Sequence, residues 1–466
     1  MDRKNSTNIV RNTYHRQASD FVPIQIMETE IGQPLPGIVA FNDKTGQHYQ
    51  RAFCLIRLHT QPLGIIELQL DEQELSAGEY ARRIWDTLHA PIVKHLQEDS
   101  LPVVTGLDAA GLPSVLPAKC IEERELFLQT APFVSIIVAT RDHPEYLARC
   151  LPTLMALHYP CYEVIVVDNA PTTTAAADFI QQAYSDESRI KYVREDRPGL
   201  SLARNCGMRV ARGEILAFTD DDVIVDSYWL IELVKAFSSG DGVACVTGLV
   251  LPLELETQAQ AWFEEFGGFN KGSTRRIFDR TSSYVDIPLY PFAAGQFGTG
   301  ANMAFTSAFL RSVGGFDPVL GTGTRTGGGE DLSTFFQVII SGHRLVYEPA
   351  SLLYHLHRRD YFQLRKQIYY YGVGLIAYLT KIVFDNPLLL FNLVAKVPYG
   401  LFFILSSRSP KNRKQSKDYP EDLILLERKG MLYGPFAYLR CRWEMRKLPR
   451  GILVSDEMYA IKLVEG

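Results

Sequence analysis

The sequence predicts an α/β fold in which a mostly parallel sheet carries helices on both faces. One observation is the alternation of short apolar runs with helical patterns from residue 131 onward. Another is that several of these runs end in polar residues, at Thr140, Asp168 and Asp220. Because the carboxyl ends of parallel strands meet at one edge of a sheet, these residues are expected to share the edge where such sheets bind ligands.

The chain is long enough for two or three domains, with 466 residues. We expect a frayed polar tail over residues 1–20, a small α+β accessory domain over 21–125, the α/β domain over 131–360, and a helical region over 361–466. Prolines at 113 and 117 and the charged run at Glu122 are expected to mark the linker before the α/β domain.

The accessory domain is predicted from a period of two in its apolar residues, which is typical of strands. A helix is expected around 77–97, because Tyr80, Ile84, Leu88 and Ile92 lie four residues apart. The expected strands are 37–41, 52–58 and 63–70. The domain shows no cluster of catalytic residue types.

Composition is that of an ordinary globular protein, with 46% hydrophobic and 22% charged residues. A net charge of -5 gives no indication of nucleic-acid binding. The seven cysteines contain no CxxC pair, so we expect reduced thiols in a cytoplasmic protein and no thiolate metal site. The residues after Met1 lack the apolar run of a signal peptide.

The α/β domain is expected to alternate strands and helices in chain order. The expected strands are 134–139, 163–168, 190–194 and the run from Glu214 to Thr219, with helices after Pro144, near 175–184 and over 201–211. The aromatic segment 249–292 is expected to be irregular. Its aromatic side chains are interpreted as core, with an acceptor-facing insertion as the alternative.

Three consecutive carboxylates, Asp220, Asp221 and Asp222, follow the fourth strand. They repel one another unless a cation neutralises them, and such oxygen ligands suit Mg²⁺ or Mn²⁺. The alternative is that they cap a helix beginning near Ser227.

A glycine-rich stretch, residues 321–329, runs into Glu330 and Asp331 at the start of a predicted helix. So many glycines predict a mobile loop that could fold over a ligand. The two carboxylates could instead serve only as favourable charge at a helix N-terminus. That position is expected to lower the pKa of Asp331.

Taken together, residues 132–360 resemble the inverting family 2 glycosyltransferases, which have the GT-A fold of nucleotide-diphospho-sugar transferases. The resemblance is carried by four features in fixed order: Val134-Ser-Ile-Ile-Val-Ala-Thr-Arg, the strand end at Asp168, the stretch from Ala203-Arg-Asn to Asp220-Asp-Asp, and Gly328-Gly-Glu-Asp.

The resemblance implies a role for each matching residue. Asp331 would be the general base, with Glu330 beside it, and Asp222 would bind a metal, Mg²⁺ or Mn²⁺, on the donor diphosphate. His355 would be a third metal or phosphate ligand, although a purely structural histidine is an open alternative. The implied substrate-binding residues are Thr140, Arg141, Asp168, Arg204, Asp221 and Asp220, the last binding the ribose or the metal.

The implied activity is transfer of a single sugar from a nucleotide-diphospho-sugar to the hydroxyl of a sugar or lipid-linked acceptor, as in surface polysaccharide or glycolipid synthesis. Family members that build polymers carry the motif Gln-x-x-Arg-Trp after the acidic pair. Residues 363–366 here read Gln-Leu-Arg-Lys, without the Trp, so we expect transfer of one sugar per cycle. One alternative is a catalytically inactive scaffold that binds nucleotide. Another is a nucleotidyltransferase, but the loop Thr140–Pro144 lacks the glycines expected of one.

The C-terminal region combines an amphipathic pattern over 361–382 with an almost wholly apolar stretch, 388–405. Five Lys or Arg follow within residues 408–417. We consider an interfacial or re-entrant membrane helix, a membrane span and a buried core helix. We expect the first, which attaches a cytoplasmic protein to the inner face of the cell membrane.

Overall fold

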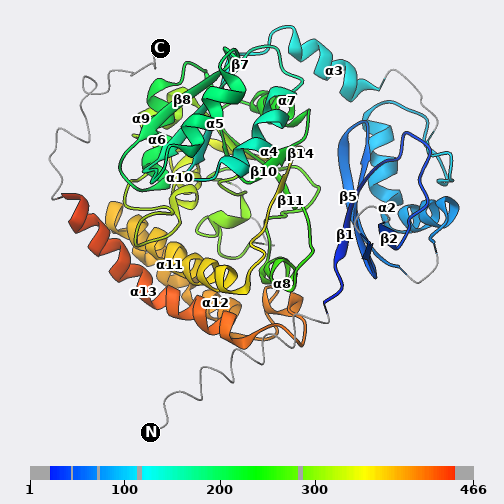
Figure 1. Ribbon diagram of the computed structural model, residues 1–466. Helices are drawn as coiled ribbons and strands as arrows, with labels where there is room; N and C mark the ends of the chain where they lie inside the picture. Colours follow the sequence, from blue (N-terminus) through cyan, green and yellow to red (C-terminus); the bar gives the residue numbers. More distant parts are fainter. Residues whose placement is uncertain (1–20, 43–45, 71–73, 113–117, 282–286, 447–466) are drawn as a thin grey trace.

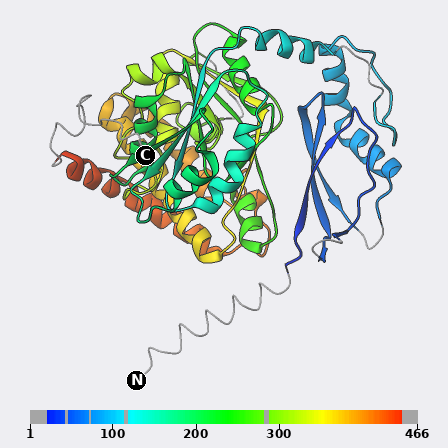
Figure 2. The same cartoon turned by 45° about the horizontal axis from the view of Figure 1, so that its top comes forward.

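The computed structural model describes residues 21–42, 46–70, 74–112, 118–281 and 287–446. The polar tail expected over 1–20 and the prolines at 113 and 117 lie outside these residues. Three parts are visible: an N-terminal sheet with its helix, a large α/β body, and a C-terminal group of helices (Figure 1). The N-terminal sheet stands beside the body, and a helix crosses the top between them (Figure 2).

The N-terminal domain is a three-stranded sheet covered on one face by a helix. The strands β1 (Ile24–Glu30), β4 (Arg51–Leu58) and β5 (Gln61–Gln69) lie in the order β1-β4-β5, and helix α2 spans Ala77–Glu98. The helix buries the predicted residues Tyr80, Ile84, Leu88 and Ile92. The strand expected over 37–41 is wrong, because this segment makes only an isolated bridge at Ile38 before the short pair β2 (Phe41–Asn42) and β3 (Gln47–His48).

The charged run at Glu122 belongs to a helix, α3 (Lys119–Leu128), within the segment expected to be a linker. Its Arg124 is buried, and its guanidinium Nε donates to Glu232 Oε1 in the α/β body at 2.8 Å. The connection between the two domains is therefore a packed element.

The α/β body is built on one nine-stranded sheet with the order β10-β14-β11-β13-β9-β6-β7-β8, and β12 pairs with β14. Neighbours β9, β6, β7 and β8 are parallel, which confirms the expected architecture. The strands are β6 (Val134–Thr140), β7 (Tyr162–Asn169), β8 (Ile190–Glu195), β9 (Ile215–Asp220), β10 (Val223–Val225), β11 (Val243–Pro252), β12 (Arg276–Phe278), β13 (Met303–Thr306) and β14 (Arg344–His355).

Helices cover both faces of this sheet, so the core has two halves. One half packs α4, α5 and α7 against one face, and the other packs α6, α9 and α10 against the opposite face. Their bounds are α4 (Pro144–Met155), α5 (Ala175–Tyr184), α6 (Leu200–Val210), α7 (Trp229–Lys235), α9 (Ser307–Ser312) and α10 (Glu330–Ile340).

The aromatic segment 249–292 is more regular than expected, because it contains the end of β11, helix α8 (Gln258–Phe266) and β12. The interpretation of its aromatic residues as core is confirmed for Trp262, Phe263 and Phe292, which are buried. Phe266, Phe269 and Tyr290 are partly buried, and Tyr284 lies outside the described residues. Trp262 and Phe263 pack with residues of the C-terminal helices.

The C-terminal region is helical, as expected, with α11 (Tyr361–Asp385), α12 (Leu389–Leu405) and α13 (Glu421–Arg446). Glycines let α11 and α13 pack closely: a Cβ on Gly372 would lie 2.1 Å from the Glu427 carbonyl oxygen. In the described part of the chain, none of the helices is both long and apolar enough to cross a membrane.

Candidate active site

The register of the parallel strands brings the predicted polar residues to one edge of the sheet. Thr140 at the end of β6 is paired with Asp168 of β7, and the preceding Ala139 is paired with Asp220 of β9. The convergence expected from the sequence is therefore present. The alternative that the three aspartates cap a helix is wrong, because strand β10 follows them directly.

Asp220, Asp222 and His355 form a group able to hold a metal ion. One ligand atom from each lies within 4.8 Å of the others, and His355 Nε2 is 3.3 Å from Asp222 Oδ1. Strand β10, which follows Asp222, pairs antiparallel with the end of β14, and this places Val223 opposite His355. Two carboxylates and an imidazole are a donor set that fits Mn²⁺ or Mg²⁺.

A chain of side chains behind His355 orients its ring. His355 Nδ1 lies 3.2 Å from His357 Nδ1, and His357 Nε2 lies 2.8 Å from Glu264 Oε1. Burial lowers the pKa of His355, which favours the neutral imidazole that a metal requires. Because Glu264 accepts from His357 Nε2, His355 can donate from Nδ1 and leave Nε2 free toward Asp222.

Asp221 makes its contacts outside the metal group. Its Oδ2 accepts a 2.6 Å hydrogen bond from Thr140 Oγ1, and His143 Nδ1 lies 3.5 Å from the same oxygen. The hydrogen bond to Asp221 raises the pKa of His143. The side chain of Arg141, in the same loop, is 47% exposed. Thr140 and Asp221 thus form one buried pair, while Arg141 is accessible to a ligand.

Asp168 is fully buried at the end of β7, with one oxygen, Oδ2, accepting from the Tyr192 hydroxyl at 2.9 Å. Among the described residues, its other oxygen, Oδ1, has no hydrogen-bond partner. Burial raises the pKa of Asp168. A buried carboxylate oxygen without a partner is costly, and such a group is a candidate for binding a ligand donor.

Arg204 links the aspartate cluster to the acidic pair. This buried guanidinium lies 3.3 Å from Asp220 Oδ1 and 3.0 Å from Glu330 Oε1, and it donates to the Gly300 carbonyl oxygen at 3.0 Å. The resemblance implied that Arg204 contacts the nucleotide. In this structure its two terminal nitrogens donate to Asp220, Glu330 and the Gly300 carbonyl oxygen, so it positions both acidic groups, and a contact with the nucleotide stays a prediction.

The two carboxylates of the acidic pair have different surroundings. Glu330 is buried against Arg204, and its Oε2 has no hydrogen-bond partner within the described residues. Asp331 is half-buried, with Oδ2 accepting from the Gly300 amide at 2.9 Å and Oδ1 accepting from the Leu332 amide at 2.8 Å. Asp331 is therefore the more accessible carboxylate of the pair.

The expected lowering of the Asp331 pKa is wrong. Burial raises the pKa of Asp331, and it raises the pKa of Glu330 to about 7, with the Asp331 charge acting in the same direction. Loss of hydration outweighs the helix N-terminus and the nearby Arg204. A carboxylate with a raised pKa is a stronger base than an ordinary aspartate.

The glycine-rich stretch before this pair is held against the body. Ser201 Oγ donates to the Leu320 carbonyl oxygen at 2.8 Å, and the buried Thr326 hydroxyl donates to the Val319 carbonyl oxygen at 3.1 Å. Gly329 has a φ of 92° and lies so close to α11 that a Cβ would be 2.6 Å from the Gly374 carbonyl oxygen. Tight turns and close packing account for these glycines, and closure over a ligand stays a prediction.

Four further residues lie at this site without having been predicted. They are Lys271, Arg358, His357 and Glu264. Arg358 Nη1 is 3.5 Å from Asp222 Oδ2. Lys271 is half-buried, and burial lowers its pKa to about 8, while the charges of Glu264 and Asp331 oppose this effect. The sequence contained a signal for His357, because it lies two residues after His355 at the end of a strand. No sequence pattern pointed to Lys271.

Comparison with known proteins identifies the family of this domain. Residues 135–291 match the family model described as Glycosyl transferase family 2. Over 225 residues the chain is 26% identical to the pre-mycofactocin glycosyltransferase of Mycobacterium tuberculosis. The aligned region covers 48% of this chain and 43% of that protein. Over 125 residues it is 35% identical to glycosyltransferase AglE of Haloferax volcanii, which covers 26% of this chain and 40% of that protein.

Other matches are more partial or more distant. The chain is 33% identical over 153 residues to the uncharacterised protein y4gI of Sinorhizobium fredii, covering 32% of this chain and 16% of that protein. The mannosyltransferase PcManGT of Pyrobaculum calidifontis, solved with GDP-Man and Mn²⁺, covers 70% of this chain and 82% of its own at 17% identity and a TM-score of 0.41. The chain thus spans less than half the length of the curated relatives cited. Its residues 135–291 form a glycosyltransferase family 2 domain, as the sequence resemblance implied.

Proposed function

We propose that this protein is an inverting, metal-dependent glycosyltransferase that moves one sugar from a nucleotide-diphospho-sugar to an acceptor hydroxyl. The observation that carries the proposal is the link through Arg204 between Asp220, beside Asp222 and His355, and the acidic pair Glu330–Asp331. Arg204 therefore lies between the group that could bind a cation and the acidic pair that contains the candidate base. Two of the relatives cited above are named glycosyltransferases.

The donor would bind along the edge of the sheet. The unpartnered Oδ1 of Asp168 suits a donor group of the base or ribose, and the exposed Arg141 suits a phosphate. Asp220, Asp222 and His355 would hold Mg²⁺ or Mn²⁺ at the diphosphate. When bound, the cation stabilises negative charge on the leaving nucleoside diphosphate.

The chemistry proposed for this chain's residues is one displacement. Asp331 accepts the proton of the acceptor hydroxyl while the oxygen of that hydroxyl forms a bond to C1 of the sugar, and the bond from C1 to the diphosphate oxygen breaks. Gly300 and Leu332 amides hold the Asp331 carboxylate in one orientation. A single displacement assisted by one base inverts the configuration at C1.

Two other functions compete with this proposal. A scaffold that binds nucleotide without turnover is disfavoured because every acidic residue of the site is retained and supported by neighbours. A nucleotidyltransferase is disfavoured because the loop after β6, Thr140–Pro144, contains no glycine with which to approach a triphosphate closely.

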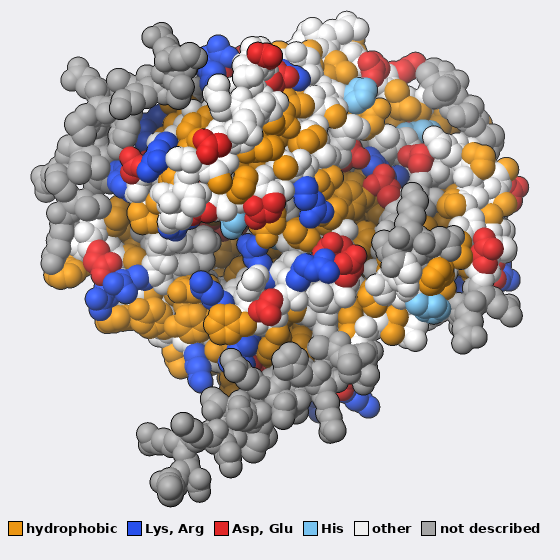
Figure 3. Space-filling view, viewed as in Figure 1, with side chains coloured by type: hydrophobic (Ala, Val, Ile, Leu, Met, Phe, Trp, Pro, Cys, Tyr) orange, Lys and Arg blue, Asp and Glu red, His pale blue; other side chains and the backbone are white. Residues whose placement is uncertain are grey.

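We further propose that the protein works at a membrane surface, on a lipid-linked acceptor of surface polysaccharide or glycolipid synthesis. Every residue of α12 is at least partly exposed, including Phe391, at 76%, and Val394, at 57%. Hydrophobic side chains also gather on the lower left of the molecule, where α12 and α13 lie (Figure 3). An exposed apolar helix followed by five basic residues in 408–417 suits an anionic bilayer surface.

The test of the glycosyltransferase proposal is a screen of nucleotide-diphospho-sugars for Mn²⁺-dependent hydrolysis without acceptor. The wild type should release nucleoside diphosphate from at least one donor, and Asp222→Asn should lose both this activity and the effect of Mn²⁺ on donor binding. Asp186→Asn, the same change at an exposed position of the same domain, is the control. If Asp222→Asn still turns over and binds donor equally with and without Mn²⁺, the site is misassigned.

A further inference from the structure

A second group of metal-ligand side chains lies in the N-terminal domain. It consists of His59, His95, Asp99 and Cys120, whose ligand atoms all lie within 4.8 Å of one another. His59 Nδ1 is 3.0 Å from His95 Nε2 and 2.9 Å from Asp99 Oδ2. Asp99 Oδ2 is also 3.2 Å from His95 Nε2 and 3.0 Å from Cys120 Sγ.

Three separate elements supply these four atoms. His59 lies in the two-residue turn between β4 and β5, and Cys120 lies in the first turn of α3. His95 and Asp99 lie four residues apart, in the last turn of α2 and at its C-cap, so they face the same side. Elements this far apart in sequence bring two nitrogens, an oxygen and a sulfur to one point.

The backbone that presents His59 is strained. His59 and Thr60 have φ of 53° and 68°, in a turn usually made by Asn-Gly because both positions are left-handed. The turn is nevertheless fixed: Glu30 accepts from the His59 amide at 3.1 Å and from the Thr60 amide at 2.9 Å. Strained residues that are held firmly often mark a functional site, because the surrounding structure must impose them.

We propose that the N-terminal domain holds a structural Zn²⁺ ion, bound by His59 Nδ1, His95 Nε2, the Asp99 carboxylate and the Cys120 thiolate. Four protein ligands with a nitrogen, oxygen and sulfur donor set form a closed tetrahedral site. The thiolate favours Zn²⁺ over the Mg²⁺ or Mn²⁺ of the sugar-nucleotide site. On binding, the Cys120 thiol releases its proton to solvent.

The distances between the ligand atoms fit such a site. Nitrogen and oxygen ligands about 2.0–2.1 Å from a tetrahedral Zn²⁺ are about 3.3 Å apart. The three separations among His59 Nδ1, His95 Nε2 and Asp99 Oδ2 run from 2.9 to 3.2 Å. A small outward movement of each side chain would admit the ion.

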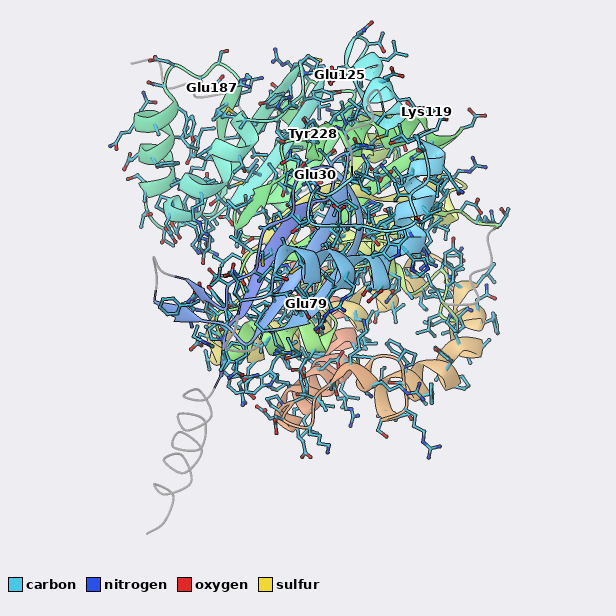
Figure 4. The ribbon with its side chains drawn as sticks, turned by 90° about the vertical axis from the view of Figure 1, so that its right-hand side faces the viewer. Glu30, Glu79, Lys119, Glu125, Glu187 and Tyr228 are labelled. Carbon is cyan, nitrogen blue, oxygen red and sulfur yellow. The ribbon has the colours of Figure 1, made fainter. Side chains whose placement is uncertain are left out.

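The ion would also fix the surface by which this domain meets the glycosyltransferase domain. Arg57, in β4 just before the turn that carries His59, pairs with Asp226 at 2.7 Å, and Arg124 of α3 pairs with Glu232 at 2.8 Å. The Arg124 guanidinium also lies 4.3 Å from the centre of the Tyr228 ring. Figure 4, viewed from the side of the N-terminal domain, shows α3 with Lys119 and Glu125 in the same region as Tyr228 and Glu30. Zn²⁺ therefore joins the hairpin, α2 and α3 into one docking surface.

The first experiment measures metal content in the full-length protein, produced in zinc-supplemented medium without a histidine tag and dialysed against Mg²⁺. Wild type and Asp222→Asn should both contain stoichiometric zinc by mass spectrometry, which separates this site from the sugar-nucleotide site. Cys120→Ser and His95→Gln should lose most of it. Cys161→Ser, a partly buried cysteine of the other domain, should retain it.

The second experiment guards against variants that fail to fold. Wild-type protein is stripped with a chelator and titrated with Co²⁺, which should give the intense visible absorption of a tetrahedral site and a thiolate-to-cobalt charge-transfer band. Stripping should also lower the melting temperature, and Zn²⁺ should restore it. A wild type with neither zinc nor a thiolate–cobalt band would overturn the proposal, as would zinc retained by both ligand variants.

Discussion

At the scale of single residues, the clearest result is the division between two adjacent carboxylates. Glu330 is buried beside Arg204, whereas Asp331 is held by two backbone amides and can be reached from the site. Position in the helix is nearly the same for both, so their surroundings decide their roles. Asp331, the half-buried carboxylate of the pair, is the one proposed as the base, whereas the buried Glu330 holds Arg204.

Asp331→Asn should lower the rate of sugar transfer by about 10² to 10⁴, the usual value of general-base assistance. Asparagine keeps the size of the side chain and, through its single carbonyl oxygen, one of the two hydrogen bonds from Gly300 and Leu332, but it cannot take the proton. Donor and Mn²⁺ affinity, measured by calorimetry, should stay close to wild type. Should Asp331→Asn transfer normally while Glu330→Gln is dead, the base is Glu330.

Glu330 should also make the stability of the protein depend on pH. Its pKa is raised from 4.5 to about 7 in the folded state, so the folded protein binds its proton more tightly than the unfolded chain. The stability due to this group is therefore complete below pH 4.5 and is lost as pH rises toward 7.

In Glu330→Gln this decline should be smaller, because glutamine has no charge to bury. The measurement is the melting temperature of both proteins across this range in the presence of a chelator, with the partly exposed Glu79→Gln as the control. An equal decline in wild type and Glu330→Gln would mean that another group dominates.

At the scale of elements, the C-terminal helices differ in burial: α11 and α13 pack against each other, whereas α12 is exposed. Glycines at 372 and 430 bring α11 and α13 into close contact, since a Cβ on either would lie 2.1 Å from a carbonyl oxygen of the other helix. Helix α12 has no comparable burial and leaves its apolar side chains accessible. The possibility of a buried core helix over 388–405 is therefore wrong, and no described helix meets the requirements for a span.

Purified protein should bind vesicles that contain anionic lipid, and it should bind less as salt rises. The double substitution Phe391→Ser with Val394→Ser removes exposed apolar area and should reduce this binding without lowering the melting temperature. Val39→Ser, a 50% exposed position on the N-terminal domain, is the matched control. Equal sedimentation of wild type and the double variant with vesicles would exclude α12 as the contact.

At the scale of the whole molecule, the N-terminal domain is docked on the glycosyltransferase domain. Leu55 of β4 packs with Leu249, Leu251 and Leu352 of the large sheet. Buried ion pairs lie at the same junction, including Arg124 with Glu232. The domain that showed no catalytic pattern in the sequence is thus positioned against α7 and β14, the strand that ends at His355.

Arg124→Met should destabilise the protein by about 3–5 kcal/mol, because it leaves Glu232 buried without its main partner. Glu232 retains Gln61 at 3.2 Å and Lys235 at 3.7 Å, so the lower end is expected. Denaturant unfolding gives the value, and Arg82→Met, which removes an exposed pair on α2, should change little. A result for Arg124→Met equal to that of Arg82→Met would show that the junction contributes little to stability.

Much of the fold and of the candidate site was predictable, because the patterns that indicate them lie in residues close together in the sequence. Strands and helices of the α/β domain follow from apolar periodicity, and the positions of Thr140, Asp168 and Asp220 follow from the ends of those strands. The errors also have local causes. Residues 37–41 alternate like a strand yet find no neighbour to pair with over their length, and the charged run at Glu122 lacks an apolar stripe because its buried residue is Arg124.

By itself, the sequence determined the α/β architecture, the family of the domain and the residue types that converge at its edge, because strand ends and short motifs are encoded by neighbouring residues. Tertiary structure alone decided which side chains face one another. It placed Arg204 between Asp220 and Glu330, raised the pKa of Asp331 by burial, and gathered His59, His95, Asp99 and Cys120 from three elements. Burial and contact between distant segments depend on how the whole chain packs, and the spacing of residues along the sequence does not predict them.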